Sequence, residues 1–94
     1  MARLTRRLSI SGRVQGVGFR SALSQKANTL QLAGWVRNRS DGSVEALVSG
    51  DPAAVEALCA WAAQGPPAAR VERLLSNDLP DSGDGHATSG FTQA

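Results

Sequence analysis

Apolar and polar residues show two different periodicities along the first third of the chain. Leu8 and Ile10 alternate with serines, which is the pattern of a strand with one buried face. A glycine-rich segment over residues 12–20 follows directly. Apolar side chains then recur at the i, i+4, i+7 spacing that gathers them on one side of a helix: Leu23, Ala27 and Leu30. The pattern predicts a strand, a loop and a helix over about residues 21–31.

The next apolar segments predict a β-hairpin. Residues 33–38 form a short run rich in Trp and Val, and Val44, Ala46 and Val48 then occupy alternate positions. Between the two runs, Asp41-Gly42 is a dipeptide that favours the left-handed backbone of a tight reversal. Two strands joined by this turn are therefore expected to pair with each other.

A second helix is predicted over about residues 52–64. Asp51 and Pro52 are typical of a helix start, because an aspartate can accept hydrogen bonds from free backbone N–H groups and proline fits the first turn. Apolar residues then recur at helical spacing until Gly65-Pro66-Pro67 stops the helix.

The last third of the chain is predicted to hold a strand, a loop and a strand fragment. Residues 70–75 form the strand, although two consecutive leucines interrupt its alternation. Residues 77–90 are rich in Asp, Ser and Gly and are predicted to be a loop, which leaves Phe91-Thr92 as a short final strand. The order β-α-β-β-α-β predicts an α+β fold, the ferredoxin-like split βαβ sandwich, in which two helices cover one face of an antiparallel sheet.

Length and composition agree with a single domain over residues 1–94. A second domain would need roughly 50 residues and a core of its own. Alanine accounts for 15 of the apolar residues, so the core must be small. No apolar run approaches the roughly 18 residues of a membrane span, and a single Cys59 forbids an internal disulfide. We therefore expect a cytoplasmic monomer with no membrane partner.

Charge is divided unevenly between the two halves of the chain. Residues 1–40 carry eight basic and no acidic side chains, whereas residues 41–94 carry two basic and eight acidic ones. Such a bias indicates an anionic partner, either a nucleic acid or a phosphate group. Nucleic-acid binding is disfavoured, because two Trp and two Phe are too few to supply paired stacking platforms. One cysteine and one histidine, Cys59 and His86, are too few for a structural zinc site, and we expect no metal and no cofactor.

The glycine-rich segment is the first candidate for chemistry, because it joins a strand to a helix N-terminus. Backbone N–H groups are unpaired there and the helix dipole favours negative charge, so glycines that allow close approach can cradle a phosphate. The alternative is a tight connection whose glycines only permit unusual backbone angles. The spacing Gly-x-x-x-Gly-x-Gly lacks the Lys-Ser/Thr end of a P-loop and does not match Gly-x-Gly-x-x-Gly, which disfavours nucleotide binding.

Two side chains near this loop could act on a bound phosphate. Arg20, at the helix entrance, could donate bidentate hydrogen bonds to two phosphoryl oxygens, or it could simply be solvated. Asn38, at the end of the second predicted strand, could hold a water molecule in line with phosphorus, because its amide both donates and accepts. It could equally be a plain turn residue.

Taken together, these segments resemble the acylphosphatase family. The nine residues Gly12-Arg13-Val14-Gln15-Gly16-Val17-Gly18-Phe19-Arg20 resemble its phosphate-binding signature. Gly34-Trp35-Val36-Arg37-Asn38 followed by Asp41-Gly42-Ser43-Val44-Glu45 resembles its second block, and Gly65-Pro66 with Ala69 and Val71 continues the pattern. The resemblance covers about residues 8–75.

The resemblance implies a function and a set of site residues. Acylphosphatases hydrolyse the carboxyl-phosphate bond of acyl phosphates, so the expected partners are a small acyl phosphate as substrate and inorganic phosphate as product. Catalysis is assigned to Arg20 and to Asn38, which would orient the water that attacks phosphorus. Phosphate binding is assigned to Arg20 and to the loop residues Arg13, Val14, Gln15, Gly16, Val17 and Gly18. The expected reaction uses no metal, because a carboxylate leaves readily without a strong general acid.

The chain departs from the family pattern in two places. Leu30-Gln31-Leu32 stands where the family usually has Leu-Gly-Leu, so Gln31 would end the helix in a left-handed conformation at a cost of about 1 kcal/mol. The C-terminal Phe91-Thr92-Gln93-Ala94 is neutral, where the family normally ends in a longer strand with an aromatic and basic residues. An alternative to a free-standing enzyme is an accessory domain of a larger maturation machine, as in carbamoyltransferases with acylphosphatase-like domains.

Overall fold

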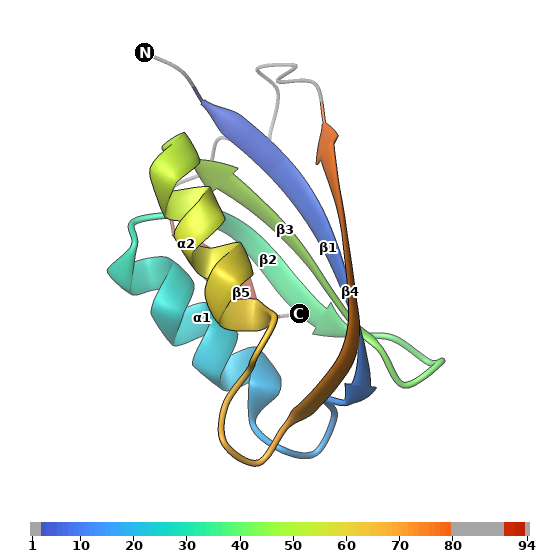
Figure 1. The fold of residues 1–94 in the computed structure, drawn as a ribbon. Helices are drawn as coiled ribbons and strands as arrows, with labels where there is room; N and C mark the ends of the chain where they lie inside the picture. Colours follow the sequence, from blue (N-terminus) through green and yellow to red (C-terminus); the bar gives the residue numbers. More distant parts are fainter. Residues whose placement is uncertain (1–2, 80–89, 94) are drawn as a thin grey trace.

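The structure is a computed structural model that describes residues 3–79 and 90–93. It has two layers, a five-stranded sheet and two helices that both lie on one face of the sheet (Figure 1). In chain order the elements are β1 Leu4–Arg13, α1 Phe19–Thr29, β2 Ala33–Asn38, β3 Val44–Gly50, α2 Pro52–Ala62, β4 Arg70–Leu79 and β5 Phe91–Gln93. The predicted α+β, ferredoxin-like order of elements is confirmed.

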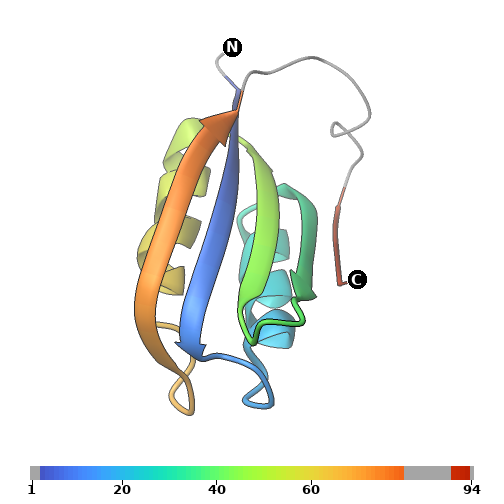
Figure 2. The ribbon, with the colours of Figure 1, turned by 90° about the vertical axis from the view of Figure 1, so that its right-hand side faces the viewer.

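The strands lie in the order β4-β1-β3-β2-β5. β1 pairs antiparallel with β3 and β4, and β2 pairs antiparallel with β3. The short β5 runs parallel to β2, so the sheet is mixed and the prediction of a wholly antiparallel sheet is wrong at this edge. β4 and β5 form the two opposite edges (Figure 2). Phe91 holds β5 in place, because its side chain is buried and its backbone N–H donates to Asn28 Oδ1 of α1 at 3.2 Å.

β4 is longer than predicted. The loop was expected from Asn77, but β4 continues through Leu79, and its last residue pairs with Thr5 of β1. A salt bridge reinforces this end of the pairing: Arg6 Nε donates to Asp78 Oδ1 at 2.6 Å. Pairing with a long neighbouring strand thus overrides the local polarity of the segment. His86 and the rest of the predicted loop, residues 80–89, lie outside the described residues.

The core lies between the sheet and the two helices. Strand residues at alternate positions meet the apolar faces of the helices, and the largest fully buried side chains include Leu8, Ile10, Val36, Leu23 and Leu58. α1 begins two residues earlier than predicted, at Phe19, whose ring is 1% exposed and lies 5.7 Å from that of Trp61. Asp51 caps α2 as predicted, accepting a hydrogen bond from the Ala53 N–H at 3.1 Å.

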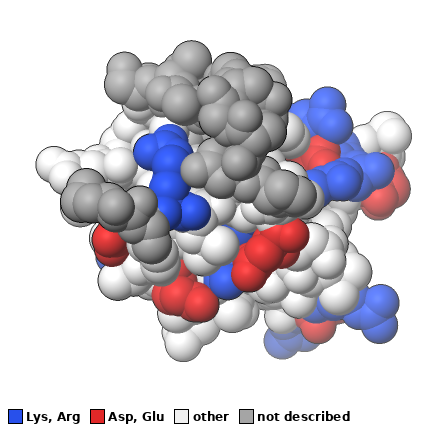
Figure 3. Space-filling model, turned by 90° about the horizontal axis from the view of Figure 1, so that it is seen from above, with Lys and Arg blue, Asp and Glu red and all other residues white. Residues whose placement is uncertain are grey.

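Folding brings the basic first half of the chain against the acidic second half. Arg6 contacts both Glu56 and Asp78, and Glu45 receives Arg7 and Arg37 on the sheet face opposite the helices. On the face shown in Figure 3, basic and acidic side chains are accordingly interspersed. Desolvation by itself would raise the pKa of Glu45, but hydrogen bonds from the two arginines outweigh it and hold that pKa below its usual value. The charges of Arg6, Arg7 and Arg37 are therefore neutralised locally.

The C-terminus of α1 has the left-handed residue that the sequence predicts. Gln31 has φ 59°, and among the described residues it is the only one other than glycine with a positive φ. Its N–H donates to Asn28 O and the Leu32 N–H donates to Ala27 O, the two bonds of a Schellman motif. The buried Leu32 packs beside Ala27, so the geometry is fixed by the core although glutamine is strained in it.

Gln31→Gly should therefore stabilise the protein. Relief of the left-handed strain is offset in part by the greater freedom of glycine in the unfolded chain, so the free energy of unfolding should rise by about 0.5–1 kcal/mol. Urea denaturation measures this. Gln25→Gly, at an exposed position inside the same helix, is the matched control and should lower stability by about 1 kcal/mol. A Gln31→Gly variant no more stable than the wild type would contradict the account.

Candidate active site

The glycine-rich loop is fixed at its ends and open in its middle. Val14 and Phe19 are each 1% exposed, and they anchor the loop in the core between β1 and α1. Gly16 and Gly18 between them are exposed, with φ 75° and 78°, and a Cβ at either position would meet nothing within 4 Å. Glycine is needed there for its backbone conformation rather than for space.

The loop leads directly into an uncapped helix N-terminus. Gly18 is the N-cap of α1, no side chain caps the helix there, and its first turn holds no acidic residue. The amides of this turn therefore have no side-chain acceptor from the cap position, and the helix dipole favours an anion beside them. This arrangement is suited to binding a phosphate-sized anion.

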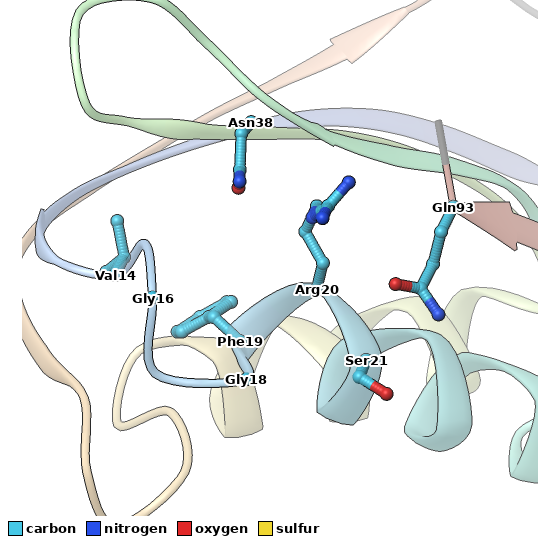
Figure 4. Close-up of a pocket in the computed structure, with 8 residues that line it drawn as sticks. All are labelled: Val14, Gly16, Gly18, Phe19, Arg20, Ser21, Asn38 and Gln93. Carbon is cyan, nitrogen blue, oxygen red and sulfur yellow. The ribbon is translucent and has the colours of Figure 1, made fainter.

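A pocket of about 170 Å³ lies over the loop and the helix start. Its lining joins three separate parts of the chain: Val14, Gly16, Gly18, Phe19, Arg20, Ser21, Asn38 and Gln93. Figure 4 shows the Arg20 side chain rising from the first turn of α1 and the Asn38 side chain extending from β2 into the same space. The structure thus brings together Arg20 and Asn38, which are distant in the sequence.

Strand alternation explains why Asn38 faces the pocket. Val36 is buried against the helices, and Asn38 follows it by two residues on β2, so both point to the helix side of the sheet. Arg37 between them points to the other side. There its guanidinium contacts Glu45 and lies 5.2 Å from the centre of the Trp35 ring.

Three of the loop residues predicted to bind phosphate are not among those that line the pocket. Arg13 is exposed, and Val17 is half-buried and packs against the core. The side chain of Gln15 turns away to the β2–β3 connection, where its Nε2 donates to Arg39 O at 2.7 Å and to Ser43 O at 2.9 Å. This leaves their backbone amides, not their side chains, as possible ligands.

Gln15 therefore links the loop to the turn that follows Asn38, and we call its two hydrogen bonds the clasp. The turn is itself ordered, because the Ser43 N–H and hydroxyl both donate to Asp41 Oδ1, at 2.9 and 2.6 Å. These hydrogen bonds from Ser43 hold the pKa of the Asp41 carboxyl below its usual value. The clasp fixes the position of Asn38 relative to the loop.

Sequence reasoning did not identify Phe19, Ser21 or Gln93 as pocket residues. Gln93 lies two residues after the buried Phe91 on β5, and it reaches the pocket because β5 pairs with β2. The strand fragment was expected from the sequence, but its neighbour in the sheet was not. Without that pairing, nothing in the sequence places Gln93 near the loop.

Within residues 3–79 and 90–93, no three His, Cys, Asp or Glu side chains come together as they would around a metal ion. In the same described segments, neither helix is long and apolar enough to cross a membrane. The residues that line the pocket carry one charged side chain, that of Arg20. Any chemistry that these residues support must therefore depend on hydrogen bonding and on that cation.

Comparison with known proteins gives a consistent result. The acylphosphatase family model matches residues 6–92. An acylphosphatase from Thermococcus kodakarensis is 58% identical over 79% of this chain and 81% of its own. One from Acidovorax sp. is 54% identical over 84% of this chain and 81% of its own. Among solved structures, an acylphosphatase from Bacillus subtilis superposes with a TM-score of 0.89 at 36% identity, covering 97% of this chain and 98% of that one.

Replacement of Gln15 tests the clasp. Gln15→Leu removes both hydrogen bonds and keeps a side chain of similar size, and the free energy of unfolding should fall by about 1–2 kcal/mol. Urea denaturation of this variant is compared with that of Gln64→Leu, which changes an exposed glutamine after α2. Equal stability of the two variants would show that the clasp does not contribute.

Proposed function

The chain belongs to the acylphosphatase family and hydrolyses acyl phosphates, and we propose that Arg20 and the loop amides hold the phosphoryl group while Asn38 orients the attacking water. The observation that carries this proposal is the shared pocket of Arg20 and Asn38 above an uncapped helix N-terminus. Each of the three parts meets a different need of the reaction. Arg20 supplies positive charge, the loop amides orient the phosphoryl group, and Asn38 positions the water.

Phosphoryl binding needs both directed amides and a cation. The loop from Gly12 to Arg20 and the first turn of α1 offer backbone N–H groups, and the positive φ of Gly16 and Gly18 keeps the loop open to the pocket. Arg20 adds a planar guanidinium, which can donate two parallel hydrogen bonds to two phosphoryl oxygens. As the transition state spreads charge over the equatorial oxygens, these same donors stabilise it.

The attacking water is held from the side of β2. The side-chain carbonyl of Asn38 can accept a hydrogen bond from the water, which orients a lone pair of the water oxygen toward phosphorus. The water oxygen forms a bond to phosphorus while the bond from phosphorus to the acyl oxygen breaks. The electron pair leaves with the carboxylate, and a water proton passes to a phosphoryl oxygen to give inorganic phosphate.

A phosphoryl oxygen is the proposed proton acceptor because no carboxylate or imidazole lines the pocket among the described residues. A carboxylate leaving group requires no strong general acid, so positioning and electrostatics supply the rate. We propose that the reaction needs no metal ion.

We also propose that the enzyme is a cytoplasmic monomer with a single domain over residues 1–94 and that it binds no nucleic acid. The one cysteine is consistent with a reducing compartment, and four aromatic residues are too few for stacking platforms.

Arg20→Lys should lose most of the hydrolysis of benzoyl phosphate and most of the affinity for inorganic phosphate, because a point charge cannot replace the guanidinium fork. The assay is run with and without a chelator, and Arg73→Lys, at an exposed position on β4, is the matched control. Wild-type activity should be unaffected by the chelator. Near wild-type turnover in Arg20→Lys would refute the bidentate role, and activity that depends on a divalent metal would refute the metal-free mechanism.

Asn38→Ala should lower turnover by roughly 10²-fold, by analogy with the loss of one positioned transition-state donor. The inhibition constant of inorganic phosphate should stay within a few-fold of the wild-type value, because phosphate binding is assigned to the loop and Arg20. Asn77→Ala, at an exposed position on β4, is the control and should leave both quantities unchanged. A parallel loss of phosphate affinity in Asn38→Ala would instead make Asn38 a structural residue.

A further inference from the structure

Gln93 occupies the side of the pocket away from Asn38. We propose that its side-chain amide donates a hydrogen bond to the acyl oxygen that leaves as a carboxylate, which makes Gln93 a further catalytic residue. The inference rests on the proposed function, because it assumes that a phosphoryl group lies over the loop. The roles proposed for Arg20, Asn38 and the loop do not involve β5, and Gln93 would give this strand a part in the reaction.

Sheet register places Gln93 on the correct face. Gln93 pairs with Val36 in the parallel β5–β2 ladder, and Phe91, two residues earlier, is buried on the helix side. Side chains alternate along a strand, so Gln93 also points to the helix side. Asn38 follows Val36 by two residues on the neighbouring strand and faces the same way.

The distance between Asn38 and Gln93 leaves room for a phosphoryl group between their side chains. Two residues along a strand span about 6.6 Å and neighbouring strands lie about 4.8 Å apart, so the Cα atoms of Asn38 and Gln93 are about 8 Å apart. Figure 4 shows the Arg20 guanidinium between the two side chains. A phosphoryl group bound to Arg20 would therefore have one neutral amide on either side.

In-line geometry then assigns different roles to the two amides. The attacking water and the leaving oxygen lie on opposite sides of phosphorus, with the water about 3–3.5 Å away at the start of the reaction. Because Asn38 orients the water, the leaving oxygen must be on the far side, toward Gln93 and Ser21. Both of these residues line the pocket and are exposed, so the acyl group can extend into solvent.

The chemistry of an amide fits this position. As the bond from phosphorus breaks, its electron pair collects on the acyl oxygen, and an N–H donor aimed at that oxygen stabilises the transition state more than the ground state. Among the described residues, no side-chain hydrogen bond holds the Gln93 amide elsewhere. The amide is thus available to the substrate.

The test measures how the rate depends on the leaving group. A series of ring-substituted benzoyl phosphates is hydrolysed by the wild type, by Gln93→Met, which keeps the length of the side chain but lacks a donor, and by Gln93→Leu. Thr92→Val, at the exposed neighbouring position whose side chain points to the other side of β5, is the matched control. The affinity for inorganic phosphate is measured for each as a competitive inhibition constant.

Both Gln93 variants should lose about tenfold in kcat/KM with the most basic leaving carboxylate and clearly less with the least basic one, so the dependence on leaving-group basicity becomes steeper. Phosphate affinity and the behaviour of Thr92→Val should match the wild type. An unchanged leaving-group dependence in both Gln93 variants would overturn the inference, as would a loss of phosphate affinity equal to the loss of rate. A wild type that hydrolyses no acyl phosphate would overturn the proposed function itself.

Discussion

The proposed active site depends on one constraint, which is that a loop with exposed amides must still have a single conformation. Amides that are to bind an anion cannot be hydrogen-bonded to the protein, so the loop cannot be stabilised by backbone pairing of its own. Instead, the buried Val14 and Phe19 fix the two ends of the loop in the core. Gln15, the residue after Val14, is hydrogen-bonded to the β2–β3 turn. The glycines between these anchors can adopt their positive φ because they carry no Cβ.

The rest of the fold brings polar side chains to this loop from a rigid sheet. Asn38 lies at the end of β2, which pairs along its whole length with the central strand β3. On the opposite face of that pair, the buried Glu45 contacts Arg37, the residue before Asn38, and Arg7 of β1. Glu45 is 2% exposed and is compensated by two arginines that are about half exposed, so this ion cluster ties three strands together. Such pairing accounts for Arg6, Arg7 and Arg37 of the basic first half, and Arg20 is the cation that reaches the pocket.

Local signals in the sequence predicted most of the fold, and they singled out Arg20 and Asn38, which the structure places in one pocket. Alternation, helical spacing and caps such as Asp51 act over a few residues, and they indicated both helices and the hairpin. The strained Gln31 was predicted from the departure from the family's Leu-Gly-Leu pattern. The predictions that were wrong concern the pairing of segments that are distant in the sequence. Nothing local indicates that β5 lies parallel to β2, or that Asn77 and Asp78 extend β4 along β1. For the same reason the clasp of Gln15 and the place of Gln93 in the pocket could not be found, because each depends on which distant segment lies beside it.

The central claim is that the loop holds the phosphoryl group, so that water attacks phosphorus and not the carbonyl carbon. Hydrolysis of benzoyl phosphate in water labelled with oxygen-18, followed by mass spectrometry of both products, tests this directly. The account predicts that the label enters inorganic phosphate and that benzoate stays unlabelled, because the bond between phosphorus and oxygen breaks. Label in benzoate would contradict it, since the attack would then be at the acyl carbon.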